Sequence, residues 1–210
     1  MVHADIEAVM ALIDTVARPG QRILIAIAGP PGSGKSTLAE AVVEQLNSKV
    51  GSQSQAALIP MDGFHLDNQD LDKQGLLTRK GAPETFDAKG LVRLVRRIRN
   101  GGADIHYPLF DRTSDRCLVD AGLLKAGTPI VVVEGNYLLL EDSPWKALAG
   151  LFDATVFLAP PVETLEERLI LRWLNYGLSP EMAAEKARGN DLRNARLVLE
   201  KSVTADLLLT

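Results

Sequence analysis

The feature that most constrains the fold of this chain is the stretch 29–37, which reads GPPGSGKST. It matches the pattern G-x-x-x-x-G-K-[ST] of phosphate-binding loops. The apolar run Ile23–Ala28 precedes it and is typical of a buried strand. Residues 38–46 follow with apolar side chains at helical spacing. Strand, glycine loop and helix in this order predict a phosphate site. The alternative, a glycine turn with an exposed lysine, is not favoured because both the strand and the helix are present.

Each part of this loop has a predicted role at a bound nucleotide. Glycines let successive backbone N–H groups point at a phosphate, beside the positive end of the following helix. Lys35 is expected to reach the β- and γ-phosphates, and the Ser36 hydroxyl to bind Mg²⁺. Thr37 is expected to contact the α-phosphate. The predicted nucleotide-binding residues of the loop are Gly29, Pro30, Pro31, Gly32, Ser33, Gly34, Lys35, Ser36 and Thr37.

Composition narrows the functional classes. A chain of 210 residues with 46% hydrophobic and 24% charged residues predicts one globular domain, residues 1–210. A net charge of -4 argues against a general nucleic-acid grip. The sequence shows neither a signal peptide nor an apolar run near the ~20 residues of a membrane span, so we expect a cytoplasmic protein without a membrane partner. The single cysteine, Cys117, reads as a small apolar filler. A homodimer is left open.

Strand and helix patterns alternate along the chain, which predicts a parallel sheet covered on both faces. The fold class expected is α/β, a three-layer P-loop NTPase fold with a mostly parallel sheet and a small helical lid at about 162–189. After residues 23–28, strands are expected at 56–59, 130–133, 154–158 and 206–209. Helices are expected at 4–17, 87–98, 161–176, 179–188 and 191–199. Residues 63–86 lack clear periodicity, and such long irregular stretches are usually functional.

Two weaker patterns complete this outline. Ile105 and Tyr107 could lie in a short strand that Pro108 would end or confine to a sheet edge. Four arginines on the helix after Asp87 are interpreted as a solvated face. They are Arg93, Arg96, Arg97 and Arg99.

Two acids follow predicted strands and are candidates for chemistry. Ligands of open α/β sheets sit beyond the carboxyl ends of the strands, which places Asp62 near the phosphates held by Lys35. Asp62 is the candidate base that deprotonates an acceptor hydroxyl. Glu134 is the candidate for holding Mg²⁺ through water or polarising the site. We expect the two acids to converge from separate sheet edges; the alternative is that each only caps a loop.

Arg168 and Arg172 lie four residues apart and therefore share one helix face. They could fold over the phosphates as a lid and supply positive charge in the transition state. The alternative is that they pair with acids of the same helix, which are Glu163, Glu166 and Glu167. The lid role is favoured for Arg168, and both possibilities stay open for Arg172.

Other nucleotide-binding classes fit less well. The sequence has no Asn-Lys-x-Asp guanine signature and no Leu-Ser-Gly-Gly-Gln segment, which argues against a GTPase and a transporter ATPase. Its length leaves no room for motor domains. Phosphoryl transfer to a small acceptor is therefore favoured. The alternatives are a nucleotide-binding regulatory module or an NTP hydrolase associated with sugar uptake.

Several segments together resemble the P-loop kinases that include uridine kinase, phosphoribulokinase and bacterial pantothenate kinase. Within this group the similarity is strongest to bacterial proteins labelled as fructose transport system kinases. It covers the chain from about residue 21 onward. The segments that carry it are 29–37, 61–68, 79–87, 107–112, 133–139 and 189–194.

The resemblance implies ATP and Mg²⁺ as cofactors and transfer to a hydroxyl of a sugar, nucleoside or pantothenate-like metabolite. It implies catalytic roles for Lys35, with Asp62 as base, Glu134 as the acid near the metal, and Arg168 as a lid arginine. Arg172 and Asn190 would lie near the nucleotide. The residues expected to line the acceptor pocket are Asp62, His65, Lys80, Asp87, Tyr107, Arg112 and Asn136.

Overall fold

A computed structural model describes residues 2–48 and 55–210, and in these residues five strands form a parallel sheet. Its order is β2-β5-β1-β6-β7, and every neighbouring pair in it is parallel. The strands are β1 Ile23–Ala28, β2 Ala56–Pro60, β5 Ile130–Gly135, β6 Ala154–Leu158 and β7 Leu207–Leu209. The predicted mostly parallel α/β sheet is confirmed.

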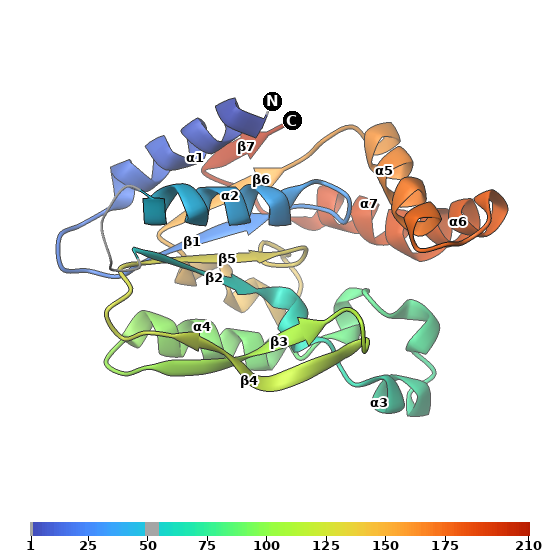
Figure 1. The fold of residues 1–210 in the computed structure, drawn as a ribbon, viewed down its shortest axis with the longest axis horizontal. Coiled ribbons are helices and arrows are strands. Elements are labelled where there is room, and N and C mark those ends of the chain that lie inside the picture. The colour runs from blue at the N-terminus through green and yellow to red at the C-terminus, as the bar shows by residue number, and fades with distance from the viewer. Residues whose placement is uncertain (1, 49–54) are drawn as a thin grey trace.

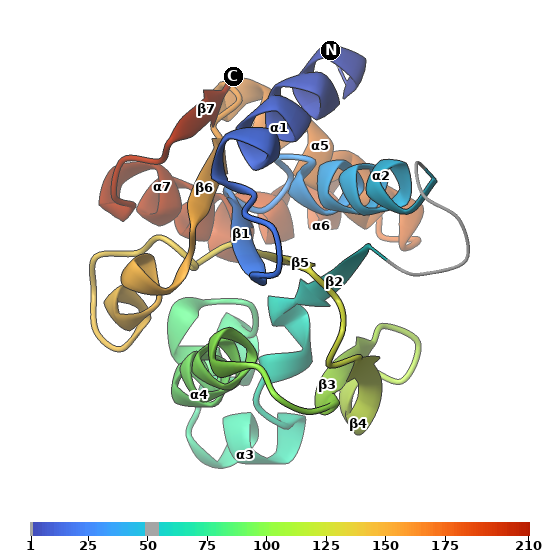
Figure 2. The same cartoon turned by 90° about the vertical axis from the view of Figure 1, so that its left-hand side faces the viewer.

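Helices cover both faces of this sheet and extend beyond one end of it (Figures 1 and 2). Helices α1 and α2 lie over one face and α4 over the other, while α5, α6 and α7 project past the end where β1 meets α2. Their bounds are α1 Val2–Val16, α2 Lys35–Ser48, α3 Asn68–Lys73, α4 Ala88–Asn100, α5 Val162–Asn175, α6 Pro180–Lys186 and α7 Leu192–Lys201. The described part of the chain contains no helix long and apolar enough to cross a membrane.

The central strand β1 shows why the sheet is covered twice. Leu24 and Ala26 point into the core beneath α4, whereas Ile23 and Ile25 point into the core beneath α1 and α2. All six residues of β1 are buried. Because successive strand side chains face opposite sides, a strand buried on both faces reads as one continuous apolar run. That is the pattern that predicted it.

A two-stranded antiparallel sheet stands apart from the parallel one. It consists of β3 Ile105–Asp111 and β4 Arg116–Leu124. Pro108 does not end β3, because the register shifts between Tyr107 and Leu109 and both strands of this sheet are edges. The irregular region before α4 holds α3 and three 3-10 turns, at 61–64, 77–79 and 83–85.

The C-terminal helices have a small core of their own. Its fully or nearly buried members are Leu165, Leu169, Ala187, Leu192 and Ala195. Between α6 and α7 the chain forms a π-helical turn, Ala187–Asp191. The helix predicted at 179–188 therefore ends at Lys186, and the last helix begins at Leu192. We call residues 162–189 the lid.

Gly63 offers a direct test of how tightly the turn at 61–64 packs under β3. A Cβ at this position would lie 2.1 Å from the Pro108 carbonyl oxygen, so Gly63→Ala must move backbone. Overpacking of this kind costs about 1–3 kcal/mol, and each kcal/mol is worth roughly 2–4 °C in a chain of this size. We expect a melting temperature lower by several degrees in thermal denaturation. Gly127→Ala, where a Cβ meets nothing within 4 Å, is the matched control, and equal melting of the two variants would contradict the packing.

Candidate active site

The loop 29–34 joins β1 to α2 and takes backbone conformations that favour glycine. Gly32 and Gly34 have φ values of +83° and +92°, in the region where a Cβ is strained. At Gly29 a Cβ would lie 2.7 Å from the Leu158 carbonyl oxygen, so the loop passes close to the end of β6. Helix α2 begins at Lys35, and its first N–H groups border the loop. The Ser33 hydroxyl is buried and has no hydrogen-bond partner among the described residues.

Lys35 lies at the centre of the charges in this region. The carboxylates of Glu134 and Asp62 both act electrostatically on its ammonium group, and so do two guanidinium groups, those of Arg172 and Arg112. Burial lowers the pKa of Lys35 from its ordinary value, while the two carboxylates oppose that shift. The structure therefore places both acids within electrostatic range of Lys35, as predicted.

The expectation that the two acids come from separate sheet edges is wrong. Strands β2 and β5 are neighbours, and Pro60 at the end of β2 pairs with Glu134. Asp62 follows two residues later in the turn 61–64. The acids converge because adjacent parallel strands end at the same edge of the sheet, close to the loop after β1.

Glu134 is the most buried charged group of the site. Its residue is 5% exposed, and its Oε2 accepts a hydrogen bond of 3.1 Å from the Ser36 hydroxyl. Burial raises the pKa of Glu134, and the neighbouring Lys35 ammonium counteracts the shift. A buried carboxylate and a hydroxyl in contact at a phosphate loop are oxygen donors of the kind that Mg²⁺ prefers.

These donors can be tested against the predicted metal. Among residues 2–48 and 55–210, no group of three or more His, Cys, Asp or Glu side chains could hold a metal ion. Mg²⁺ in phosphate-transfer sites usually keeps waters and binds one or two carboxylates together with substrate phosphates. The pair of Ser36 and Glu134 fits such a site, in which phosphate oxygens and water complete the ligand set.

Asp62 is half-buried and engaged from two directions. Its Oδ2 accepts a 2.9 Å hydrogen bond from Nη2 of Arg112, whose side chain is 63% exposed. Its backbone oxygen lies 2.8 Å from Nδ1 of His65. The Cys117 thiol donates to the backbone oxygen of His65 at 3.3 Å, so this cysteine is more than an apolar filler.

His65 and Lys80 lie around the ring of Phe110. The imidazole sits 4.0 Å from the ring of Phe86 and 4.7 Å from that of Phe110, measured between centroids. Burial lowers the pKa of His65. Lys80 Nζ lies 5.1 Å from the Phe110 centroid and pairs with Oδ1 of Asp115 at 2.8 Å. The structure thus gathers Asp62, His65 and the Lys80 ammonium, because the carboxylate and the ammonium both act electrostatically on the imidazole.

Other predicted acceptor residues have structural partners. Asp87 caps α4 by accepting from the Gly90 N–H at 2.8 Å, and it also lies 3.4 Å from Arg93. Tyr107 is buried and donates to the Leu58 carbonyl at 3.2 Å. Asn136 follows β5, and its buried Oδ1 has no partner in the part of the chain that the structure describes. Their contact with an acceptor stays a prediction.

The two lid arginines have different partners. Arg168 Nη1 donates to the carbonyl oxygens of Gly32 and Ser33, each at 3.2 Å, so it lies directly over the loop. Arg172 pairs with Asp191 at 2.7 Å and not with an acid of its own helix, while its contact with the phosphates stays a prediction. Glu166 instead pairs with Arg188.

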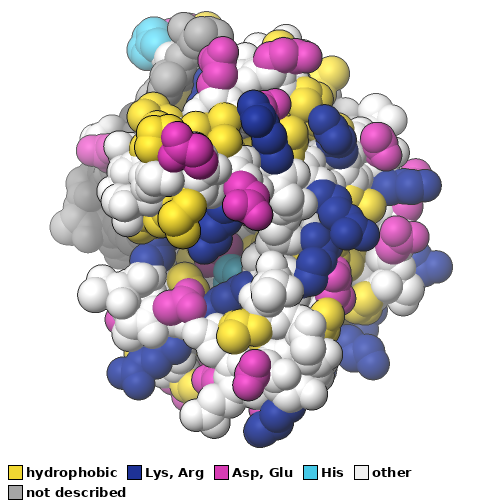
Figure 3. Space-filling model, turned by 90° about the vertical axis from the view of Figure 1, so that its right-hand side faces the viewer, with side chains coloured by type: hydrophobic (Ala, Val, Ile, Leu, Met, Phe, Trp, Pro, Cys, Tyr) yellow, Lys and Arg dark blue, Asp and Glu magenta, His cyan; other side chains and the backbone are white. Residues whose placement is uncertain are grey.

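Figure 3 looks onto the side of the molecule where α3, α5 and α6 project in Figure 1. The surface is hollowed there, and Lys, Arg, Asp and Glu side chains line the hollow.

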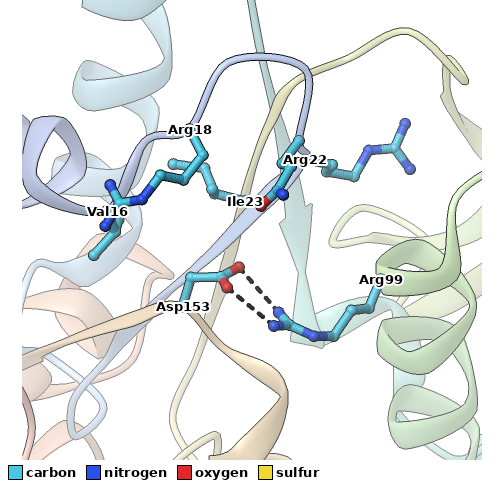
Figure 4. Close-up of a pocket in the computed structure, with 7 residues that line it drawn as sticks. Val16, Arg18, Arg22, Ile23, Arg99 and Asp153 are labelled. Carbon is cyan, nitrogen blue, oxygen red and sulfur yellow. Dashed lines mark hydrogen bonds and ion pairs between the residues drawn. The ribbon is translucent and has the colours of Figure 1, made fainter.

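A second cavity, of about 480 Å³, lies elsewhere, at the start of β1 (Figure 4). In it Arg99 binds both oxygens of Asp153 at 3.0 Å. Arg99 is therefore an ion-pair partner, but it is exposed like Arg93, Arg96 and Arg97, so all four lie on the predicted solvated face.

Sequence reasoning missed the residues that hold the predicted ones. Asn68 and Asp115 both bind Lys80, and Arg79 donates to Asn190 Oδ1 at 2.6 Å. Asp191, which the resemblance places near the nucleotide, binds Arg172. Asn68 and Arg79 lie in segments that carry the resemblance, whereas Asp115 lies outside them, and local pattern does not show these contacts because the partners lie up to 111 residues apart.

Comparison with known proteins gives consistent results. Residues 24–175 match the model of the "Phosphoribulokinase / Uridine kinase family". The "Putative uridine kinase C227.14" of Schizosaccharomyces pombe is 36% identical over 198 residues, or 90% of this chain and 83% of its own. A pantothenate kinase of Streptomyces coelicolor is 30% identical over 75% of this chain, which spans about half (49%) of that protein. The crystal structure of a "putative fructose transport system kinase" from Silicibacter sp. TM1040 has a TM-score of 0.91 and 40% identity, covering 98% of each chain.

The raised pKa of Glu134 predicts how stability depends on pH. An acid whose pKa is higher in the folded than in the unfolded chain contributes stability below its unfolded pKa and loses it as pH rises through the folded pKa. The shift already includes attraction to Lys35, so Glu134→Gln should make the ligand-free protein more stable at pH 8 but not near pH 4. The melting temperature of Glu134→Gln should therefore exceed that of the wild type at pH 8, with no such gain near pH 4. Equal or lower melting of Glu134→Gln at pH 8 would contradict this.

Proposed function

Because this chain belongs to the phosphoribulokinase/uridine kinase family, we propose that it is a kinase that transfers the γ-phosphoryl group of ATP to a hydroxyl group. The acceptor is a sugar, nucleoside or pantothenate-like metabolite, and the reaction requires Mg²⁺. The observation that carries this proposal is the position of Lys35 beside both Glu134 and Asp62. A phosphate loop alone serves many classes of protein, whereas an added acid beside the lysine provides a base for an acceptor.

The phosphate side of the reaction is assigned to the loop and the lid. Backbone N–H groups of residues 32–37 bind phosphate oxygens, and the Lys35 ammonium binds the β- and γ-phosphates. Ser36 and Glu134 hold Mg²⁺, which when bound neutralises phosphate charge. Arg168, already over the loop, adds positive charge beside the transferred group.

The acceptor side is assigned to Asp62 and its surroundings. The acceptor oxygen forms a bond to the γ-phosphorus, the bond from that phosphorus to the ADP oxygen breaks, and the hydroxyl proton passes to the Asp62 carboxylate. Arg112 donates a hydrogen bond to one oxygen of this carboxylate, so Arg112 and the acceptor hydroxyl must share the carboxylate. The remaining pocket contacts come from the side chains of His65, Lys80, Asp87, Tyr107 and Asn136.

The role of Asp62 is tested by measuring ADP formation with a panel of sugars, nucleosides and pantothenate-like alcohols. We expect one class to stimulate ADP formation, and Asp62→Asn to reduce that rate by about 10²–10⁴, the usual contribution of a general base. Asp70→Asn, an exposed aspartate paired with Lys73 on α3, is the matched control. Unchanged turnover in Asp62→Asn would remove the base role. Hydrolysis that no metabolite alters would favour the NTP hydrolase instead.

The role of Lys35 is tested by nucleotide binding alone. ATP with Mg²⁺ at a hundredfold excess over its dissociation constant should stabilise the wild type by about 2.7 kcal/mol. This corresponds to a rise of roughly 5–10 °C in melting temperature. Lys35→Ala should lose most of the rise, while the exposed Lys146→Ala keeps it. The same rise in both variants would contradict a phosphate role for Lys35.

A further inference from the structure

The π-helical turn Ala187–Asp191 lies between α6 and α7 and contacts both sides of the site. Such turns are rare and occur frequently at functional sites, because they interrupt the regular helical hydrogen bonding. Two consecutive residues of this turn, Asn190 and Asp191, bind partners that belong to different parts of the molecule.

Asp191 faces the nucleotide side. Its Oδ2 accepts hydrogen bonds from Nη2 of Arg172 at 2.7 Å and from Nε1 of Trp173 at 2.6 Å. Its side chain is only 14% exposed, so the ion pair is shielded from water. Arg172 in turn acts electrostatically on Lys35. Asp191 therefore fixes a guanidinium group that is sensitive to charge at the phosphate loop.

Asn190 faces the acceptor side. Its Nδ2 donates to the Lys80 carbonyl at 2.8 Å, and its Oδ1 accepts from Arg79 at 2.6 Å. Both ends of its amide are engaged in these bonds, and the nucleotide contact that the resemblance implied stays a prediction. Gly81, the residue after Lys80, accepts a hydrogen bond of 2.5 Å at its carbonyl oxygen from the hydroxyl of Tyr137, which lies just beyond the end of β5. The backbone that carries the Lys80 ammonium is thus held between the end of β5 and the π-helical turn.

We propose that Asn190 and Asp191 are positioning residues that couple nucleotide binding at Arg172 to the placement of Lys80 in the acceptor pocket. The proposal rests on the proposed kinase function. Phosphates beside Lys35 attract Arg172, and any movement of its guanidinium changes its bond to Asp191. Because Asn190 is the neighbouring residue of the same turn, its hold on Lys80 changes as well. By linkage, acceptor and nucleotide then change each other's affinity by the same factor.

The test is hydrogen exchange across residues 77–85 with and without Mg²⁺ and AMP-PNP, a nucleotide that is not hydrolysed. Backbone bonds such as Ala82 N–H to Arg79 O and Thr85 N–H to Ala82 O report directly on this segment. In the wild type we expect the nucleotide to change the exchange rate there by at least about fivefold, the lower limit of typical coupling between sites.

Asn190→Ala should abolish this nucleotide-dependent change while keeping AMP-PNP affinity within about twofold. Arg188→Ala is the matched control, because Arg188 lies in the same turn and binds Glu166 without touching the acceptor side. Its nucleotide-dependent change should match that of the wild type. Arg79→Met removes one of the two bonds that join Asn190 to this segment and must reduce the nucleotide-dependent change even if Asn190→Ala does not fold.

Three results would overturn the coupling. The first is no change of exchange in wild-type protein that binds AMP-PNP, which leaves the kinase function standing. The second is faster exchange in Asn190→Ala under both conditions with the nucleotide effect intact, which marks a purely structural tether. The third is a large loss of AMP-PNP affinity in Asn190→Ala, which would return Asn190 to the nucleotide site. Failure of the wild type to bind AMP-PNP would contradict the kinase function as well.

Discussion

The charges around Lys35 determine how this site is built. Its ammonium lies within the electrostatic reach of two carboxylates, Glu134 and Asp62, that arrive on neighbouring parallel strands. A buried carboxylate is unfavourable, and the electrostatic attraction of the Lys35 ammonium offsets part of that cost at Glu134. The glycine loop supplies N–H groups beside them. The ligand-free site is therefore held in a charged arrangement suited to phosphate and metal.

The parallel sheet explains why so few residues can assemble this arrangement. In the order β2-β5-β1, three strands end side by side at the same edge. Lys35 begins α2 directly after the loop that follows β1, Glu134 lies near the end of β5, and Asp62 lies in the short turn after β2. The predicted lid, residues 162–189, contacts the same edge through Arg168, whose guanidinium donates hydrogen bonds to the carbonyl oxygens of Gly32 and Ser33.

The sequence predicted what depends on local pattern and missed what depends on partners. Strands of the parallel sheet were recognisable because burial on both faces makes them continuous apolar runs. Strand β4 was not, because most of its residues are exposed and carry little apolar pattern. Strand order is absent from local pattern, so β2 and β5 were not expected to be neighbours. Likewise, Arg172 has acids on its own helix but binds Asp191, 19 residues away, because folding brings the π-helical turn closer.

The central claim is that the terminal phosphate binds between Lys35 and Asp62. A crystal structure with Mg²⁺ and AMP-PNP tests it most directly. The account predicts the γ-phosphate beside the Lys35 ammonium, the metal on Ser36 and Glu134, and the Asp62 carboxylate facing the γ-phosphorus with space for an acceptor hydroxyl between them. A γ-phosphate turned away from Asp62, with the lid already closed over it, would contradict the account.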